Sequence, residues 1–258
     1  MTAVAYEFRP SRTHTDLFSG LLRAKSQFGG KHEILVDGDD RVLTYNEVVR
    51  AAFGLGSALT RHTEKGENVG VMLPTGAGAV IAFYALQAYG RIPAMLNFTA
   101  GSRNLKAAGR AAQVTKLVTA HKFVELGNLE PLIEELKDQY EIIYLEHVRE
   151  ALTLKDKVAG GLGPVFPWLF KSTAHHKATG VVLFTSGTEG DPKSVVLSHE
   201  NVMANVEQVR AHIDIYPETD ILFNPLPTFH CFGLTVGAVL PVVAGVKSIF
   251  HPCLSEMV

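Results

Sequence analysis

The chain has 258 residues, of which 47% are apolar and 19% charged, and its formal net charge is −2. This apolar content excludes bulk disorder, and the near-balance of basic and acidic residues provides no general attraction to nucleic acid. The two cysteines, Cys231 and Cys253, are too few for a disulfide framework, so we expect a cytoplasmic setting.

Two stretches without charged residues, 69–90 and 221–246, are each long enough to span a bilayer. Proline and glycine interrupt both of them. We therefore expect strand–turn–helix pieces buried in an α/β core rather than membrane-spanning helices.

Short apolar runs alternate with helical patterns along the first 150 residues. Thr44 and Glu47 form a capping-box pattern that predicts the start of one helix. The predicted strands are 33–36, 68–73, 92–96, 117–120 and 142–144, and the predicted helices are 44–61, 77–88, 103–112 and 129–140. This alternation indicates an α/β fold of parallel βαβ units with helices on both faces.

The segment 159–179 interrupts this rhythm, because it combines glycine and proline with Trp168, Phe170 and Lys171. One interpretation is a loop that packs its aromatic side chains on the domain. A second is a surface patch at 161–171 for lipid or a partner, since aromatic residues beside lysine suit a membrane interface. Disorder is the third, and the segment is also a candidate subdomain boundary.

A loop rich in hydroxyl and glycine residues follows the predicted strand 181–184. It contains three hydroxyls, two glycines and Lys193, a combination that suits polyphosphate: glycine lets backbone N–H groups approach, and lysine adds positive charge. It is not the usual P-loop, because Pro192 replaces the second glycine and a strand, 194–197, follows instead of a helix. The alternative is a hairpin turn made of ordinary turn residues.

The order Phe-Thr-Ser-Gly-Thr-x-Gly-x-Pro-Lys over residues 184–193 resembles the phosphate-loop signature of the adenylate-forming (AMP-binding) superfamily. Two positions depart from its commonest form: Glu189 stands where Thr or Ser is more usual, and Ser194 where glycine commonly follows the lysine. Further similar segments are 43–48, 90–97 and 225–233.

Other segments are similar to bacterial fatty acyl–acyl-carrier-protein synthetases, which are often fused to an acyltransferase of the 2-acylglycerophosphoethanolamine type. These segments are 93–101, 201–208 and 229–237. The resemblance implies that residues 1–258 are the N-terminal portion of an adenylation domain with αβαβα layering. It implies a ligase that activates a fatty acid as acyl-AMP and passes it to a pantetheine thiol of acyl carrier protein. An acyl-CoA synthetase and a non-catalytic phosphate-binding module are the alternatives.

The resemblance also implies roles for individual residues. His230 would lie beside the acyl pocket and the α-phosphate, and Phe229 and Gly233 would contact substrate. A core histidine and a packed helix are the respective alternatives. Lys193 and His230 are the expected catalytic residues. Seven residues are expected to bind the ATP phosphates: Thr185, Ser186, Gly187, Thr188, Glu189, Gly190 and Lys193.

Magnesium is expected with ATP, but the resemblance places its carboxylate ligand beyond residue 258, together with the ribose-binding Asp and a C-terminal lysine. We therefore expect a fragment that is inactive by itself. No metal site is expected within the chain, because no HExxH occurs and His175 and His176 are adjacent. Contact with the inner face of a membrane would come through 161–171 or a fused acyltransferase domain.

Overall fold

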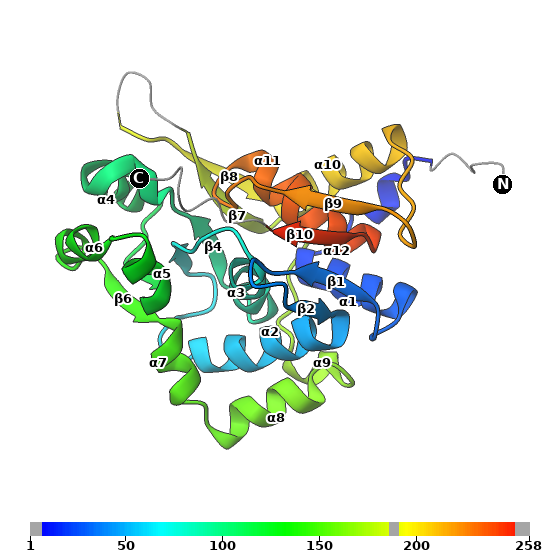
Figure 1. Cartoon of the computed structure of the whole chain (residues 1–258), viewed down its shortest axis with the longest axis horizontal. Helices are drawn as coiled ribbons and strands as arrows, with labels where there is room; N and C mark the ends of the chain where they lie inside the picture. The colour runs from blue at the N-terminus through cyan, green and yellow to red at the C-terminus, as the bar shows by residue number, and fades with distance from the viewer. Residues whose placement is uncertain (1–6, 186–190, 251–258) are drawn as a thin grey trace.

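The computed structural model describes residues 7–185 and 191–250 and contains two β-sheets flanked by helices (Figure 1). The larger sheet has the strand order β6-β5-β3-β4-β7-β8, and the smaller has the order β2-β1-β10-β9. The strands are β1 (Glu33–Val36), β2 (Val42–Thr44), β3 (Asn68–Val71), β4 (Ile92–Met95), β5 (Lys116–Thr119), β6 (Glu141–Tyr144), β7 (Thr179–Phe184), β8 (Ser194–Ser198), β9 (Ile221–Asn224) and β10 (Lys247–Phe250).

The α-helices include the four predicted in the first 150 residues, the helix that the sequence predicts after the capping residue Ser198, and several that the patterns missed. They are α1 (Leu17–Phe28), α2 (Tyr45–Leu59), α3 (Ala77–Ala88), α4 (Gly101–Ala111), α5 (His121–Leu126), α6 (Glu130–Leu136), α7 (Leu145–Glu150), α8 (Leu154–Leu162), α9 (Pro167–Phe170), α10 (His199–His212), α11 (Cys231–Leu234) and α12 (Leu240–Ala244). Short turns η1 (Pro10–Arg12) and η2 (Phe98–Ala100) are 3₁₀-helical, and η3 (Thr235–Val239) is π-helical.

Strand pairing confirms the predicted α/β fold. Strand β3 lies between β4 and β5 and is parallel to both, and β4 is parallel to β7. The sheets are mixed only at their edges, where β2 runs antiparallel to β1 and β8 antiparallel to β7. The β7–β8 pair is a hairpin, so the residues between these strands connect two neighbours rather than crossing the sheet.

The first uncharged stretch contains β3 and the buried helix α3, and the second contains β9, α11, η3 and α12. Both stretches therefore supply core elements, as predicted. Within residues 7–185 and 191–250, no helix has the length and apolar character needed to cross a membrane.

The capping box predicted at the start of α2 is present: Thr44 Oγ1 accepts from the Glu47 N–H at 3.4 Å, and Glu47 Oε2 accepts from the Thr44 N–H at 2.8 Å. The larger core cluster joins α1, α2 and α3 to α10, η3 and α12. Within it the Tyr45 hydroxyl donates to the Val242 carbonyl at 2.5 Å, which connects α2 to α12.

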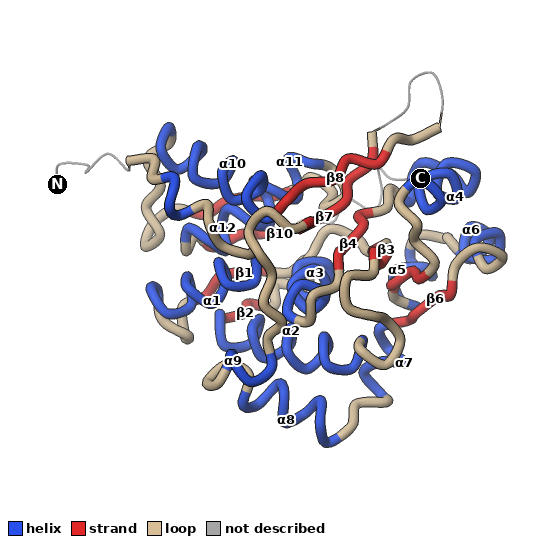
Figure 2. Tube along the Cα trace, turned by 180° about the vertical axis from the view of Figure 1, so that it is seen from behind, coloured by secondary structure: helices blue, strands red, loops and turns tan. Residues whose placement is uncertain are grey.

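The segment 159–179 is not one continuous loop, because α8 and α9 occupy part of it. A second capping box, formed by Thr153 and Asp156, starts α8. Phe170 packs on Phe53 with ring centroids 6.3 Å apart, as the loop-packing interpretation expects, whereas Trp168 is 70% exposed. Viewed from behind, α2, α8 and α9 lie together at one end of the molecule, away from the β7–β8 hairpin (Figure 2).

Candidate functional site

The two arms of the hydroxyl-rich loop meet at the end of the β7–β8 hairpin. The Thr185 N–H donates to the Lys193 carbonyl at 3.1 Å, and the Lys193 N–H donates to Thr185 Oγ1 at 3.3 Å. These two bonds close the neck of the loop and leave both residues exposed. The other predicted phosphate-binding residues lie outside the described residues: Ser186, Gly187, Thr188, Glu189 and Gly190.

The neck is anchored differently on its two sides. Strand β7, which leads to Thr185, is paired with β4 on one side and β8 on the other. Strand β8, which follows Lys193, is paired with β7 and touches α4 through the Ser194 hydroxyl, which lies 3.4 Å from the Ala111 carbonyl. The hairpin prediction is thus confirmed for the backbone, and phosphate binding by the loop stays a prediction.

His230 lies in the turn between β9 and α11, and it is exposed, so the alternative of a core histidine is wrong. Its Nδ1 accepts from the Phe232 N–H at 3.3 Å and thereby caps α11. In the neutral imidazole this hydrogen bond places the proton on Nε2. The turn therefore presents an N–H donor on an exposed ring, which suits an oxyanion or phosphoryl oxygen.

Phe229 and Gly233 support this turn from inside. Phe229 packs edge-on against Phe98 with centroids 5.3 Å apart. A Cβ on Gly233 would lie 2.2 Å from the Pro227 carbonyl oxygen, so the backbones approach too closely for any other residue. Packing explains both residues, as the helix alternative expects, and their contact with substrate stays a prediction.

The second apolar cluster connects the phosphate-loop hairpin to the His230 turn. Phe184, the last residue of β7, and Phe229 both pack against it, and its buried members include Phe98, which follows β4. Thr75 Oγ1 also lies 3.3 Å from the Leu226 carbonyl, beside the same turn. Segments that follow β3, β4, β7 and β9 thus gather beyond the carboxyl ends of the strands, where open α/β sheets bind ligands.

A cavity of about 680 Å³ lies elsewhere, between α2, α3, α7 and α8. Its lining combines the apolar side chains of Leu55 and Ile81 with the basic side chains of Arg50 and Arg149, and it contains none of the predicted site residues. The chemistry-bearing motifs, and not this cavity, therefore define the candidate active site.

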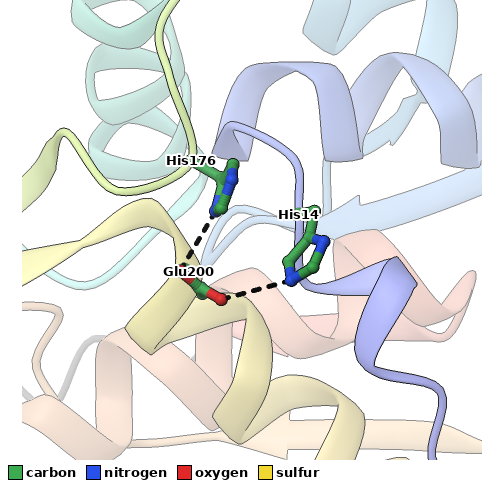
Figure 3. A group of neighbouring side chains, drawn as sticks. All are labelled: His14, His176 and Glu200. Carbon is green, nitrogen blue, oxygen red and sulfur yellow. Dashed lines mark hydrogen bonds and ion pairs between the residues drawn. The ribbon is translucent and has the colours of Figure 1, made fainter.

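One group of candidate metal ligands was missed by the sequence patterns: His14, His176 and Glu200 meet in space (Figure 3). They come from three separate segments, so no local spacing motif reveals them. The expectation that the histidines form no metal-ligand constellation does not agree with this arrangement.

The family model described as "AMP-binding enzyme" matches residues 22–256. A long-chain-fatty-acid–CoA ligase from Bacillus subtilis is 27% identical over 235 residues, covering 81% of this chain and 42% of that protein. The acyl-CoA ligase sidI from Aspergillus fumigatus is 30% identical, covering 80% of this chain and 36% of that protein. The chain thus spans about two fifths of the length of these relatives.

The structural matches agree in fold. The inhibitor-bound N-terminal domain of FACL13 from Mycobacterium tuberculosis has a TM-score of 0.77 at 19% identity, over 92% of this chain and 57% of that one. The o-succinylbenzoate-CoA synthetase MenE from Bacillus subtilis, solved with ATP and magnesium ion, has a TM-score of 0.74 at 20% identity, over 90% of this chain and 44% of that one.

Proposed function

We propose that this chain, which belongs to the AMP-binding enzyme family, is the N-terminal portion of an ATP-dependent ligase that activates a fatty acid. In the first step a carboxylate oxygen attacks the α-phosphorus of ATP and pyrophosphate leaves, which gives acyl-AMP. In the second step a pantetheine thiol attacks the acyl carbonyl and AMP leaves. The observation that carries the proposal is the β7–β8 hairpin: Phe184, the last residue of β7 before the phosphate-loop motif, packs against the same apolar cluster as Phe229 of the His230 turn.

This chain's residues would act by charge and position. Lys193, exposed at the neck of the loop, would offset the negative charge of the β- and γ-phosphates, and Thr185 with the loop residues would donate hydrogen bonds. The Nε2–H of His230 would donate to an oxygen of the reacting phosphoryl or carboxylate group. Mg²⁺ prefers oxygen ligands, and the proposal places its carboxylate ligand in the part of the protein beyond residue 258.

The test is fatty-acid-dependent ATP–pyrophosphate exchange in the full-length protein. We expect Lys193→Ala to lower the exchange rate by about tenfold to a hundredfold, because one preorganised charge contact is lost. The matched control is Lys177→Ala, which removes an exposed lysine at the other end of β7 and should leave the rate unchanged. Equal rates in both variants would reject the assignment of the loop.

The acceptor thiol has two candidates. The named relatives are CoA ligases, which favours CoA, and the residue resemblance at 201–208 and 229–237 favours acyl carrier protein. We propose acyl carrier protein as the physiological acceptor. Parallel thioester assays with CoA and with phosphopantetheinylated carrier protein decide between them: faster turnover with CoA would overturn this choice. Exchange without thioester formation on either would favour adenylation alone, and nucleotide binding without exchange would favour the phosphate-binding module.

We further propose that α8 and α9 contact an anionic bilayer surface. Leu154, Val158 and Leu162 are exposed apolar residues at every fourth position of α8, so they form an apolar stripe along this helix. Lys155 and Lys157 are exposed on the same helix, whereas its carboxylate, Asp156, is buried and paired with Arg61. The α8–α9 patch consists of Leu154, Val158, Leu162, Val165, Phe166, Trp168 and Leu169.

Trp168 is the only tryptophan in the chain, so its fluorescence reports on the patch directly. We expect a blue shift with vesicles that contain phosphatidylglycerol and little change with pure phosphatidylcholine vesicles. In cosedimentation, Leu169→Ser should weaken vesicle binding, while Ile213→Ser, which removes an exposed apolar side chain at the end of α10, should not. Absence of binding to the anionic vesicles would contradict this proposal without affecting the ligase proposal.

A further inference from the structure

Three side chains from distant parts of the sequence converge beside the first turn of α10 (Figure 3). His14 lies between η1 and α1, His176 precedes β7, and Glu200 belongs to α10. His14 Nε2 lies 3.4 Å from Glu200 Oε1, and His176 Nδ1 lies 3.0 Å from Glu200 Oε2. One ligand atom from each residue lies within 4.8 Å of the other two.

Backbone hydrogen bonds hold these segments together independently of the three side chains. The Glu200 N–H donates to the His176 carbonyl at 2.8 Å, and the His199 N–H donates to the Ala178 carbonyl at 3.1 Å. The N-terminal segment is attached as well, because the Leu17 N–H donates to His199 Nδ1 at 3.3 Å. The convergence is therefore a property of the fold and does not depend on a chance meeting of mobile side chains.

From this geometry we propose that His14, His176 and Glu200 bind a divalent transition-metal ion of the zinc class. Two imidazole nitrogens and one carboxylate oxygen suit Zn²⁺, which leaves a fourth position for water. Ligand atoms bound at about 2.0–2.1 Å to one tetrahedral ion lie about 3.3 Å from one another. The two distances to Glu200, 3.4 and 3.0 Å, bracket this value but end on different carboxylate oxygens, so small shifts of the carboxylate and of both histidines would bring one ligand atom from each residue onto the ion.

The accessibility of the site also suits an exchangeable ion. The His14 side chain is 52% exposed, whereas His176 and Glu200 are only partly exposed. The two rings are stacked, with centroids 4.7 Å apart and planes inclined by 25°. Since a metal binds in the plane of the imidazole, the exposed His14 ring would rotate to complete the site. The bound ion would fasten the N-terminal segment and the start of β7 to α10.

Without a metal, the His176–Glu200 hydrogen bond and the contact between His14 and Glu200 would still contribute to stability, so loss of stability on mutation does not distinguish the two roles. Saturable metal binding does. The chain also offers a matched control: His121 Nε2 and His147 Nε2 lie 3.2 Å apart, and in the described ranges this pair belongs to no three-ligand group. A pair of histidines without the carboxylate should bind the ion much more weakly.

The experiment is calorimetric titration of the purified, untagged and EDTA-treated protein with Zn²⁺, supported by Co²⁺ absorption in the visible range. We expect one equivalent of Zn²⁺ to bind, and His14→Ala and Glu200→Gln each to weaken the affinity by about tenfold or more. His147→Ala should leave the affinity within about twofold of the wild type. Binding should also fall on acidification, because the imidazoles must be neutral to coordinate the ion.

Three outcomes would overturn the proposal: no saturable Zn²⁺ binding, unchanged binding in His14→Ala, or an equal loss in His147→Ala. Circular dichroism of each variant in EDTA checks that it is folded. If Glu200→Gln fails to fold, the test depends on His14→Ala, which changes an exposed side chain. The readout is metal binding and not ligase activity, so the result is separate from that of the exchange assay.

Discussion

Removing the carboxylate of Asp156 should destabilise the protein far more than removing a surface carboxylate. Asp156 is 1% exposed and accepts four hydrogen bonds. The Ser57 hydroxyl donates to Oδ1 at 2.7 Å, and Oδ2 accepts from Arg61 at 2.6 Å and from the Thr153 N–H and hydroxyl at 2.9 and 2.8 Å. These contacts connect α2 to α8, so Asp156→Ala removes a link between the two helices and leaves Arg61 without its ion-pair partner.

The expected loss is about 3–4 kcal/mol in the free energy of unfolding. Breaking a buried ion pair from one side costs about 3–5 kcal/mol. We take the lower part of this range, because Arg61 is partly exposed and water can replace one of its contacts. Asp138→Ala is the matched control: its carboxylate pairs with Lys106 on the surface, and such pairs contribute about 0–1 kcal/mol.

The effect should depend on pH with a definite sign. Burial raises the pKa of Asp156, but hydrogen bonds from Ser57, Thr153 and Arg61 outweigh burial and hold it well below its ordinary value. A lowered pKa means that the stabilisation is complete above the unfolded-state pKa of about 3.9 and declines by about 1.4 kcal/mol per pH unit below it. The difference between wild type and Asp156→Ala should therefore be constant from pH 7 to about 5 and shrink below about 4.

Urea-induced unfolding, followed by circular dichroism at a series of pH values, measures this difference. If Asp156→Ala loses a free energy of unfolding at pH 7 within about 0.5 kcal/mol of the loss in Asp138→Ala, the reasoning is refuted, since Asp156 would then contribute no more than a surface ion pair. A difference that grows as the pH falls would refute it as well, because it would require a raised and not a lowered pKa.

Two further predictions concern buried contacts. Tyr45→Phe should lower the free energy of unfolding in urea by about 1–2 kcal/mol, because the carbonyl of Val242 loses its donor. Tyr84→Phe should be neutral or stabilising, because the buried Tyr84 hydroxyl has no hydrogen-bond partner in the described part of the chain. Equal losses in the two variants would contradict this prediction. Gly233→Ala should cost about 1–3 kcal/mol and lower ATP–pyrophosphate exchange in the full-length protein, because its Cβ would collide with the Pro227 carbonyl and displace the His230 turn. A thermal-unfolding midpoint equal to that of the wild type would show that the turn adapts.

The elements that the sequence predicted well are those whose signals are local. Helix α3 has the predicted bounds because Pro74 and Gly76 mark its start and Gly90 follows its end, and α2 begins at its capping box. Helix α1 was missed although it too has a local signal: Asp16 Oδ1 accepts from the Ser19 N–H at 2.8 Å and caps it. That capping residue could have indicated the helix from the sequence.

Other features depend on tertiary contacts and are not visible in local patterns. Helix α8 ends in several glycines, which favour a loop when they are considered alone. In the fold a Cβ on Gly160 would lie 3.2 Å from the Arg50 carbonyl, so this glycine allows α8 to lie close against α2. The cluster of His14, His176 and Glu200 likewise exists only after three distant segments have packed together. For the phosphate loop itself, the motif predicted its position between two strands and the fold confirmed that position.

The two strands that flank the phosphate loop are anchored unequally, and this should affect how readily each of them opens. Strand β7 has a neighbouring strand on both sides, whereas β8 is the edge strand of its sheet and β7 is the one strand paired with it in the described part of the chain. Local opening of a strand at a sheet edge exposes fewer contacts than opening of an interior strand and so requires less free energy. In hydrogen exchange the amides on the Lys193 side should therefore exchange before those leading to Thr185. Strand β8, which follows Lys193, would thus open locally while the central strands of the sheet stay paired.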